Sequence, residues 1–259
     1  KHKFLTYSKL KNQQMIPLLE EKFKVRNYEV GAGKKLSLHH LLNYFQEIAS
    51  NHASMLGWSY EDMLEKGFFW ALSRMELEFE RLPNWGETVR VQTWAKGTEK
   101  FFAVRDFLVL DLEGNELVRA SSVWLVVDIA TKRPKRASII MDKIPNLTEK
   151  NALKISLGKL TPLENKVLEV ERAVNQSELD LNRHVNNAKY IDWLIDCFPI
   201  NYIEEKELQK LTLQFVSETK AGDSVVLGLS ESENKSLISA HFANSNKKVV
   251  EGLFEWKGK

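Results

Sequence analysis

Three side chains that can hold or exchange protons stand at alternate positions of one short segment. They are Asp180, Asn182 and His184, and the pattern of a buried helix begins soon after them. On an extended or tightly turning backbone, alternate residues lie on one side, so the three groups would converge on a small volume. A carboxylate, a carboxamide and an imidazole can together orient water, polarise a carbonyl and transfer a proton near neutral pH. The same residue types also form turns and helix caps, so the segment alone leaves a purely structural interpretation equally open.

Two longer segments have the period of helices that would position this cluster. Apolar residues from Leu38 to Met55 recur every 3.6 residues, which predicts an amphipathic helix of five turns. The segment from Ala188 to Phe198 has the same period and only a narrow polar stripe, so it has to be covered nearly all round. Pro199 ends it, because the residue before a proline is pushed out of helical geometry.

A third, shorter helix is predicted from Ser59 to about Glu65. Ser59 and Asp62 have the spacing of a capping box, in which each side chain accepts a hydrogen bond from the other residue's backbone N–H. Gly67 then supplies the residue that ends the helix.

The chain contains two copies of one unit. Residues 74–89 match residues 210–225 at a constant offset of 136, and residues 118–124 match 250–256 at an offset of 132. Both copies alternate like strands and turn at a glycine. The pattern of each copy therefore predicts one helix followed by about four long antiparallel strands. This is an α+β architecture in which a curved sheet wraps a helix. The first copy lacks the Asp-x-Asn-x-His triplet in the equivalent stretch, around Val30 to His40.

Composition limits the class of protein. Of the 259 residues, 43% are apolar and 28% charged, and the net charge is +2, which is typical of a globular protein and gives no reason to expect nucleic acid as a partner. No apolar run is long enough to cross a bilayer, no signal-peptide pattern opens the chain, and Cys197 is the single cysteine, so a cytoplasmic location is expected. No glycine-rich phosphate loop and no cluster of metal ligands is present, so no cofactor and no metal are expected.

The motifs then point to a family. The relevant stretches are Asn51–Ala53, Leu56–Trp58, Phe69–Met75, Pro83–Val89, Thr93–Trp94 and Asp180–Asn187. In order and spacing the chain resembles the acyl-acyl-carrier-protein thioesterases, which contain two fused hotdog repeats, and the resemblance covers most of its length. It implies residues 1–150 as an N-terminal repeat that shapes the acyl-chain pocket, with a linker from about residue 131. It implies residues 151–259 as the C-terminal repeat with the catalytic residues. The activity implied is hydrolysis of a fatty acyl thioester on acyl carrier protein, which releases the free fatty acid.

The resemblance also assigns the catalytic residues. Asp180, Asn182 and His184 match the family's aspartate, asparagine and histidine, and Glu218, on the first strand after the second helix, completes the group. Some relatives have a cysteine directly after this glutamate, but this chain has Thr219 there, so a cysteine nucleophile is not available at that position.

Each of the four groups has a role that its chemistry suits. Glu218 is expected to be the general base, sharing the water with His184, whose reference pKa is about 6.5. Asn182 would donate to the carbonyl or hold the water, and Asp180 would orient Asn182 or His184. Backbone N–H groups near Asn186 and Asn187, at the start of the helix, are expected to be free to bind the oxyanion.

For several other residues, a functional role competes with a purely structural interpretation. Trp58, Phe69 and Trp70 are candidates for the acyl pocket, although ordinary core packing is the default. The basic run of Lys132, Arg133, Lys135 and Arg136, together with Lys96, Lys100 and Arg105, is a candidate surface for docking the acidic carrier, although a solvated linker is the default. His52 and Cys197 are expected to be buried structural residues, and His39 and His40 to be solvated or capping.

Two competing functions stay open. A hotdog hydratase or dehydratase also uses aspartate, asparagine and histidine, but usually with a wider spacing between the last two. A non-catalytic acyl-binding protein would have the same fold, yet all four polar residues are present here. A homodimer is expected from the family, and a monomer is the alternative.

Overall fold

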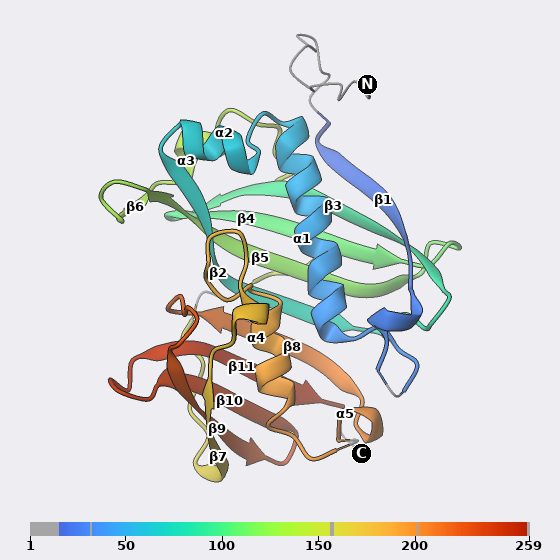
Figure 1. The fold of residues 1–259 in the computed structure, drawn as a ribbon. Helices are drawn as coiled ribbons and strands as arrows, with labels where there is room; N and C mark the ends of the chain where they lie inside the picture. The colour runs from blue at the N-terminus through green and yellow to red at the C-terminus, as the bar shows by residue number, and fades with distance from the viewer. Residues whose placement is uncertain (1–15, 32, 156–157, 201, 258–259) are drawn as a thin grey trace, which may run out of the picture.

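One antiparallel sheet runs through the whole molecule (Figure 1). The computed structural model describes residues 16–31, 33–155, 158–200 and 202–257. In this part of the chain the sheet has eleven strands in the order β1-β3-β4-β5-β2-β8-β11-β10-β9-β7, with β6 paired to β5 beside this path. The strands of the first copy are β1 (Leu18–Lys24), β2 (Phe68–Phe79), β3 (Thr88–Glu99), β4 (Phe102–Leu110), β5 (Glu116–Asp128) and β6 (Pro134–Lys135). Those of the second copy are β7 (Asn165–Ala173), β8 (Leu208–Phe215), β9 (Ser224–Ser232), β10 (Lys235–Phe242) and β11 (Lys248–Trp256).

A helix lies across each half of the sheet: α1 across the first and α4 across the second (Figure 1). The helices are α1 (Leu38–Met55), α2 (Tyr60–Glu65), α3 (Ser138–Met141), α4 (Lys189–Ile195) and α5 (Tyr202–Glu205), with short 3-10 turns at Asn27–Glu29 and Gln176–Glu178. None of the helices that the structure describes is both long and apolar enough to span a lipid bilayer.

Helix α1 has the predicted bounds, which confirms the periodicity argument. Its first turn is capped by Ser37, whose Oγ accepts a hydrogen bond from the N–H of His40; such a cap typically contributes about 1 kcal/mol. Leu41, Phe45 and Ile48 face the sheet and are at most 2% exposed. The short helix α2 is also confirmed, with the Ser59–Asp62 capping box formed as predicted.

The two copies meet at the pairing of β2 with β8. In this antiparallel register Glu76 lies opposite Thr212, and these two residues are also repeat equivalents at the offset of 136. A pseudo-twofold axis therefore passes through this pair. The largest apolar cluster extends across the seam and includes residues of both α1 and α4, so the two copies share one core.

Helix α4 is shorter than the sequence predicts. The regular helix ends at Ile195 instead of running to Phe198, because Cys197 and Phe198 donate their N–H groups to carbonyls three residues back. This tighter turning leads into Pro199. Helix α4 packs closely on β11 at Gly252, where an added Cβ would lie 2.5 Å from Leu194 Cδ1.

The segment between the copies is bound to the sheet over much of its length. Residues 134–135 form β6 against β5, and α3 follows. Beyond α3, Leu147 donates its N–H to the carbonyl of Ala95, and Ala152 donates its N–H to Asp106 Oδ2 at 2.8 Å. A segment with such contacts is part of the fold of the first copy and not a free tether.

Candidate active site

The segment with the alternating polar residues forms a tight turn. Leu179 and Val185 pair as an isolated antiparallel bridge, and the N–H of Asp180 donates to the carbonyl of His184 at 2.7 Å. Arg183 adopts the left-handed conformation, with φ of 62°. Of the two backbone shapes considered from the sequence, the structure therefore has the turn.

The carboxylate of Asp180 holds the backbone of this turn. Its Oδ1 accepts from the N–H of Asn182 at 2.8 Å and from the N–H of His184 at 3.2 Å. This arrangement is an Asx turn extended by one further bond. Asp180 therefore fixes where the side chains of Asn182 and His184 begin.

The imidazole of His184 faces the carboxylate of Glu218. Nδ1 lies 3.4 Å from Oε2, and the two side chains are 40% and 56% exposed. A pair so exposed contributes little to stability, because water screens it. It does place two groups that can exchange protons side by side at a surface that a substrate can reach.

Glu218 lies in the loop between β8 and β9, so its predicted place on the strand is wrong. The strand ends at Phe215, because the N–H groups of Val216 and Ser217 both donate to the carbonyl of Val249 and break the regular ladder. The loop is tied to the turn by the N–H of Val185, which donates to the carbonyl of Thr219 at 2.9 Å.

Thr219 is occupied by a structural contact. Its Oγ1 lies 2.9 Å from the hydroxyl of Tyr190, which also accepts from the N–H of Thr219, and Thr219 is 1% exposed. Burial raises the pKa of the Tyr190 hydroxyl, which therefore stays neutral. Helix α4, the turn and the loop after β8 are thus joined at one buried point.

The start of α4 differs from the expectation at Asn186. Its N–H donates to the carbonyl of Glu178 at 2.9 Å, so the predicted free donor at this position is wrong. The side-chain Oδ1 of Asn186 accepts from the N–H of Ala188 at 2.8 Å, directly before the start of α4.

Two side chains of the first copy contact this region, and the sequence interpretation missed both. The hydroxyl of Tyr60, the first residue of α2, donates to Oδ1 of Asn182 at 2.7 Å. Gln46 of α1 donates from Nε2 to Oδ1 of Asn186 at 3.2 Å. No local pattern signals contacts between residues so far apart in the chain.

His39 also belongs to this junction, so its prediction as solvated or capping is wrong. It is 9% exposed, and Nδ1 lies 2.9 Å from the carbonyl oxygen of Ala188 and 3.2 Å from Oδ2 of Asp192. His40 does take part in capping, with Nδ1 2.8 Å from Oγ of Ser37.

The three predicted pocket residues divide between two faces of the sheet. Trp58 and Trp70 pack on an apolar cluster at the α2 and α3 end of the first copy, around Met63 and Ile140. Phe69 points away from this cluster, because neighbouring strand residues face opposite sides, and its ring lies 5.6 Å from Nζ of Lys132.

The predicted structural residues His52 and Cys197 are buried. His52 is fully buried, with Nε2 2.8 Å from the carbonyl of Ile16, and burial lowers its pKa to about 4. Cys197 is 4% exposed, and burial raises the pKa of its thiol to about 11. Such a thiol is protonated near neutral pH and is a poor nucleophile.

The basic run is exposed, as a docking surface requires. Two of the residues expected to extend this surface, Lys96 and Arg105, are not available to bind a carrier. Lys132, Arg133, Lys135 and Arg136 are all exposed, and Lys135 lies 3.4 Å from Asp128. Lys96 donates to the carbonyl of Leu153 at 3.0 Å and lies 3.5 Å from the buried Asp106. Arg105 donates to His52 Nδ1 and to Thr93, and burial lowers the pKa of its guanidinium to about 10. The segment after α3 covers Lys96, and α1 covers Arg105.

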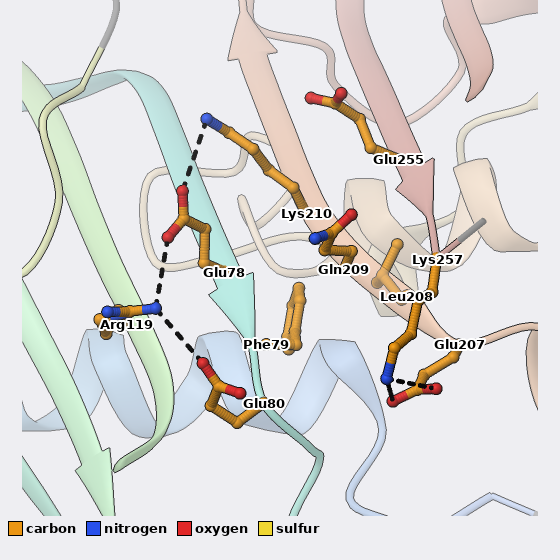
Figure 2. A pocket seen from close by; sticks show the side chains of 10 residues that line it. All are labelled: Glu78, Phe79, Glu80, Arg119, Glu207, Leu208, Gln209, Lys210, Glu255 and Lys257. Atoms are coloured by element: carbon orange, nitrogen blue, oxygen red, sulfur yellow. Dashed lines mark hydrogen bonds and ion pairs between the residues drawn. The ribbon is translucent and has the colours of Figure 1, made fainter. Parts of the chain in front are cut away.

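A hollow of about 410 Å³ lies away from these residues, where β2 ends and β8 begins (Figure 2). Its charges largely pair with one another: Arg119 lies between Glu78 and Glu80, and Lys257 contacts Glu207. No predicted site residue lines it.

The class of protein follows from the architecture. A curved antiparallel sheet around a helix, formed twice by one chain, is the double hotdog fold. The 12:0-ACP thioesterase from Umbellularia californica has this fold with a TM-score of 0.82, at 24% identity over 93% of this chain and 98% of that chain. An acyl-ACP thioesterase from Bacteroides thetaiotaomicron gives a TM-score of 0.80 at the same identity and the same coverage. The predicted fold is confirmed.

Sequence comparison identifies the family. The model of the acyl-ACP thioesterase N-terminal domain matches residues 18–144, and that of the C-terminal domain matches residues 163–257. The chain belongs to the acyl-ACP thioesterase family.

Plant thioesterases are among the relatives that sequence comparison finds. The chloroplastic palmitoyl-acyl carrier protein thioesterase of Arabidopsis thaliana is 33% identical over 232 residues, which are 82% of this chain and 54% of that protein. The chloroplastic oleoyl-acyl carrier protein thioesterase of Coriandrum sativum is 30% identical over 223 residues, 80% of this chain and 60% of that protein. The chain thus spans little more than half the length of these relatives.

Proposed function

We propose that the chain hydrolyses the thioester of fatty acyl-acyl carrier protein, releasing the free fatty acid and the carrier with its free thiol. The observation that carries this proposal is the His184–Glu218 pair beside Asn182, in the C-terminal copy of a member of this family. The names of the plant relatives support the same substrate class.

In the proposed reaction water attacks the acyl carbonyl. Glu218 accepts a proton from the water as the oxygen of that water bonds to the carbonyl carbon. Nδ1 of His184 lies 3.4 Å from Oε2 of Glu218, so the imidazole is placed to share this proton. The carbon–sulfur bond then breaks, and the leaving sulfur takes a proton from the same pair. Because the carbonyl oxygen becomes negative on the way, a hydrogen-bond donor aimed at it accelerates the reaction.

Asn182 is the proposed donor to this oxygen. Its Oδ1 accepts a hydrogen bond from Tyr60, and its NH₂ group, which is the donor of the amide, can bond to the substrate. Asp180 supports both neighbours through their backbone N–H groups. A donor from the backbone of Asn186 is not part of the proposal, because that N–H is already used.

Activated water is a better nucleophile here than a side chain. Thr219 is buried against Tyr190, and the Cys197 thiol has its pKa raised to about 11. Neither side chain meets the carbonyl as an ionised nucleophile.

Several finer assignments belong to the same proposal. The N-terminal copy, residues 1–150, would hold the acyl chain, with Trp58 and Trp70 supported as lining residues by their shared cluster. The exposed run Lys132–Arg136 would dock the acidic carrier. A homodimer and a cytoplasmic location stay predictions.

The test uses purified protein with acyl carrier protein loaded with acyl chains of several lengths, and in parallel with acyl-CoA and enoyl-CoA. Free thiol and free acid are followed together. Release of both from the carrier substrate is the expected result. Hydration of enoyl-CoA without thiol release would replace the proposal with the hydratase alternative.

A further inference from the structure

The side-chain amide of Asn182 is held from outside its own copy of the fold. Its backbone is fixed locally by Asp180, but in the part of the chain that the structure describes its Oδ1 bonds to Tyr60, 122 residues earlier in the sequence. The O···O distance is 2.7 Å, which is typical of a hydroxyl donating to a carbonyl oxygen.

Tyr60 is itself firmly placed. It opens α2, whose first turn is closed by the capping box: Asp62 accepts from the N–H of Ser59 at 2.8 Å and from its hydroxyl at 2.7 Å. The next turn is anchored by Met63, which is 1% exposed and packs in the apolar cluster with Trp58 and Trp70. The helix that carries Tyr60 is therefore held in place, and the phenol, itself 40% exposed, extends from it to Asn182.

The bond has a chemical consequence for the amide. An amide side chain can sit with its oxygen and nitrogen exchanged, and the hydrogen bond that the Tyr60 hydroxyl donates to Oδ1 stabilises the orientation found in the structure. With the Tyr60 hydroxyl at Oδ1, the NH₂ group is directed to the other side. Donation to Oδ1 also polarises the amide and makes its N–H groups stronger donors.

We infer that Tyr60 is a positioning residue for the proposed thioester hydrolysis, which locks the amide of Asn182 with its NH₂ group toward the substrate carbonyl. The inference rests on the proposed function. It gives the first copy of the fold a part in the chemistry of the second, in addition to holding the acyl chain. The NH₂ group of Asn182 is proposed to stabilise the negative charge that develops on the carbonyl oxygen in the transition state. Loss of the bond from Tyr60 should therefore lower kcat and leave KM nearly unchanged.

The experiment compares Tyr60→Phe with Tyr28→Phe. Tyr28 is 65% exposed, and its hydroxyl contacts Arg26, so this control removes the same atom away from the turn. Loss of one hydrogen bond of ordinary net strength corresponds to a kcat lower by about fivefold for Tyr60→Phe. KM should stay at the wild-type value, Tm should fall by no more than about 4 °C, and Tyr28→Phe should match the wild type in kcat and KM.

A double-mutant cycle separates positioning from a general structural effect. If Tyr60 acts through Asn182, Tyr60→Phe should lower the residual kcat of Asn182→Ala no further. An equal loss in both backgrounds, or a Tyr60→Phe variant with wild-type kcat, overturns the inference.

A readout without turnover keeps the inference distinct from the proposed function. In protein labelled with ¹⁵N at asparagine, the side-chain NH₂ signal of Asn182, assigned from its absence in Asn182→Ala, should shift in Tyr60→Phe and not in Tyr28→Phe. An inactive wild type defeats the thioesterase proposal, and an unshifted signal defeats the contact, whichever way the activity assay comes out.

Discussion

In its described residues, 30–31 and 33–36, the first turn has the same backbone contacts as the turn at residues 179–185. Each is closed by an isolated antiparallel bridge, and in each the residue after the bridge donates its N–H to the carbonyl four positions on, at 3.2 Å in the first and 2.7 Å in the second. Lys34 and Arg183 occupy the equivalent left-handed position, with φ of 55° and 62°.

Their side chains differ where chemistry is proposed. The first turn has Gly31, Gly33 and Lys35 at the positions of Asp180, Asn182 and His184. Because the first turn forms without a carboxylate, an amide or an imidazole, the backbone does not require them. The difference is consistent with the proposal that the polar residues of the second turn serve catalysis, and Asp180 also stabilises that turn.

The largest expected effect comes from removing the imidazole of His184, which has no counterpart in the first turn. His184→Ala should lower kcat for acyl carrier substrate by about a hundredfold to ten-thousandfold, the usual contribution of a general acid–base. The matched change Lys35→Ala in the first turn should leave kcat unchanged. Equal losses of kcat in the two variants, measured by thiol release, would show that catalysis does not depend on the second turn alone.

Closer packing of helix on sheet is the next difference between the copies. Gly252 of β11 corresponds to Ala120 of β5, so the first copy has room for a methyl group that the second lacks. Gly252→Ala should lower the free energy of unfolding by about 1–3 kcal/mol, because the fully buried side chain of Leu194 has to shift within a packed core.

Urea unfolding measures this effect, with Gly228→Ala as the control. An added Cβ at Gly228 would meet nothing closer than 3.9 Å, so that variant should be as stable as the wild type or slightly more stable. A Gly252→Ala protein of wild-type stability would contradict the close packing of α4.

The first copy contains a buried histidine whose titration should make the stability of the protein depend on pH. Burial lowers the pKa of His52 in the first copy to about 4, below its ordinary value of 6.5. Between these values the unfolded chain binds a proton that the folded protein does not, so acid favours unfolding. From about pH 7 to about pH 5 this group should remove about 1–2 kcal/mol of stability.

His52→Gln tests this, since glutamine does not titrate and can still donate to the carbonyl of Ile16 and accept from Arg105. Urea unfolding at both pH values should show a smaller loss in the variant, while turnover near neutral pH stays at the wild-type rate. An unchanged loss of stability would mean that His52 is not buried in the neutral form.

The smallest expected effect concerns docking by the first copy. Reversing Arg133 and Arg136 to Glu should raise KM for acyl carrier substrate by about threefold to tenfold, more at low salt, and leave acyl-CoA unaffected. Reversing Lys22 and Lys24, exposed on β1, changes the net charge equally and should have no such effect. If both substrates lose equally, the basic run is not a carrier surface.

The sequence predicts local features of this fold well and long-range ones poorly. Helix α1 and the capping box of α2 depend on neighbours within one or two turns, so periodicity and spacing identify them. The repeat predicts equivalent strands but not that β2 of one copy pairs with β8 of the other, since register is set by tertiary packing.

The candidate site shows the same limit. Alternation brings Asp180, Asn182 and His184 together, because that grouping is local. The family resemblance supplies Glu218, and only the three-dimensional arrangement shows Tyr60 beside the turn and His39 at the start of α4. Contacts across the seam leave no periodic signal in either partner.

The seam between β2 and β8 has a consequence for the order in which the protein is made. Residues such as Arg74 and Gln214, hydrogen-bonded across it, are 140 positions apart. While the chain grows on the ribosome, β2 is synthesised long before β8 and keeps one open edge until the second copy emerges. Open strand edges invite pairing with other chains, and contacts between distant residues slow folding. The nascent first copy, before β8 is made, is therefore the stage at which the edge of β2 is most open to pairing with other chains.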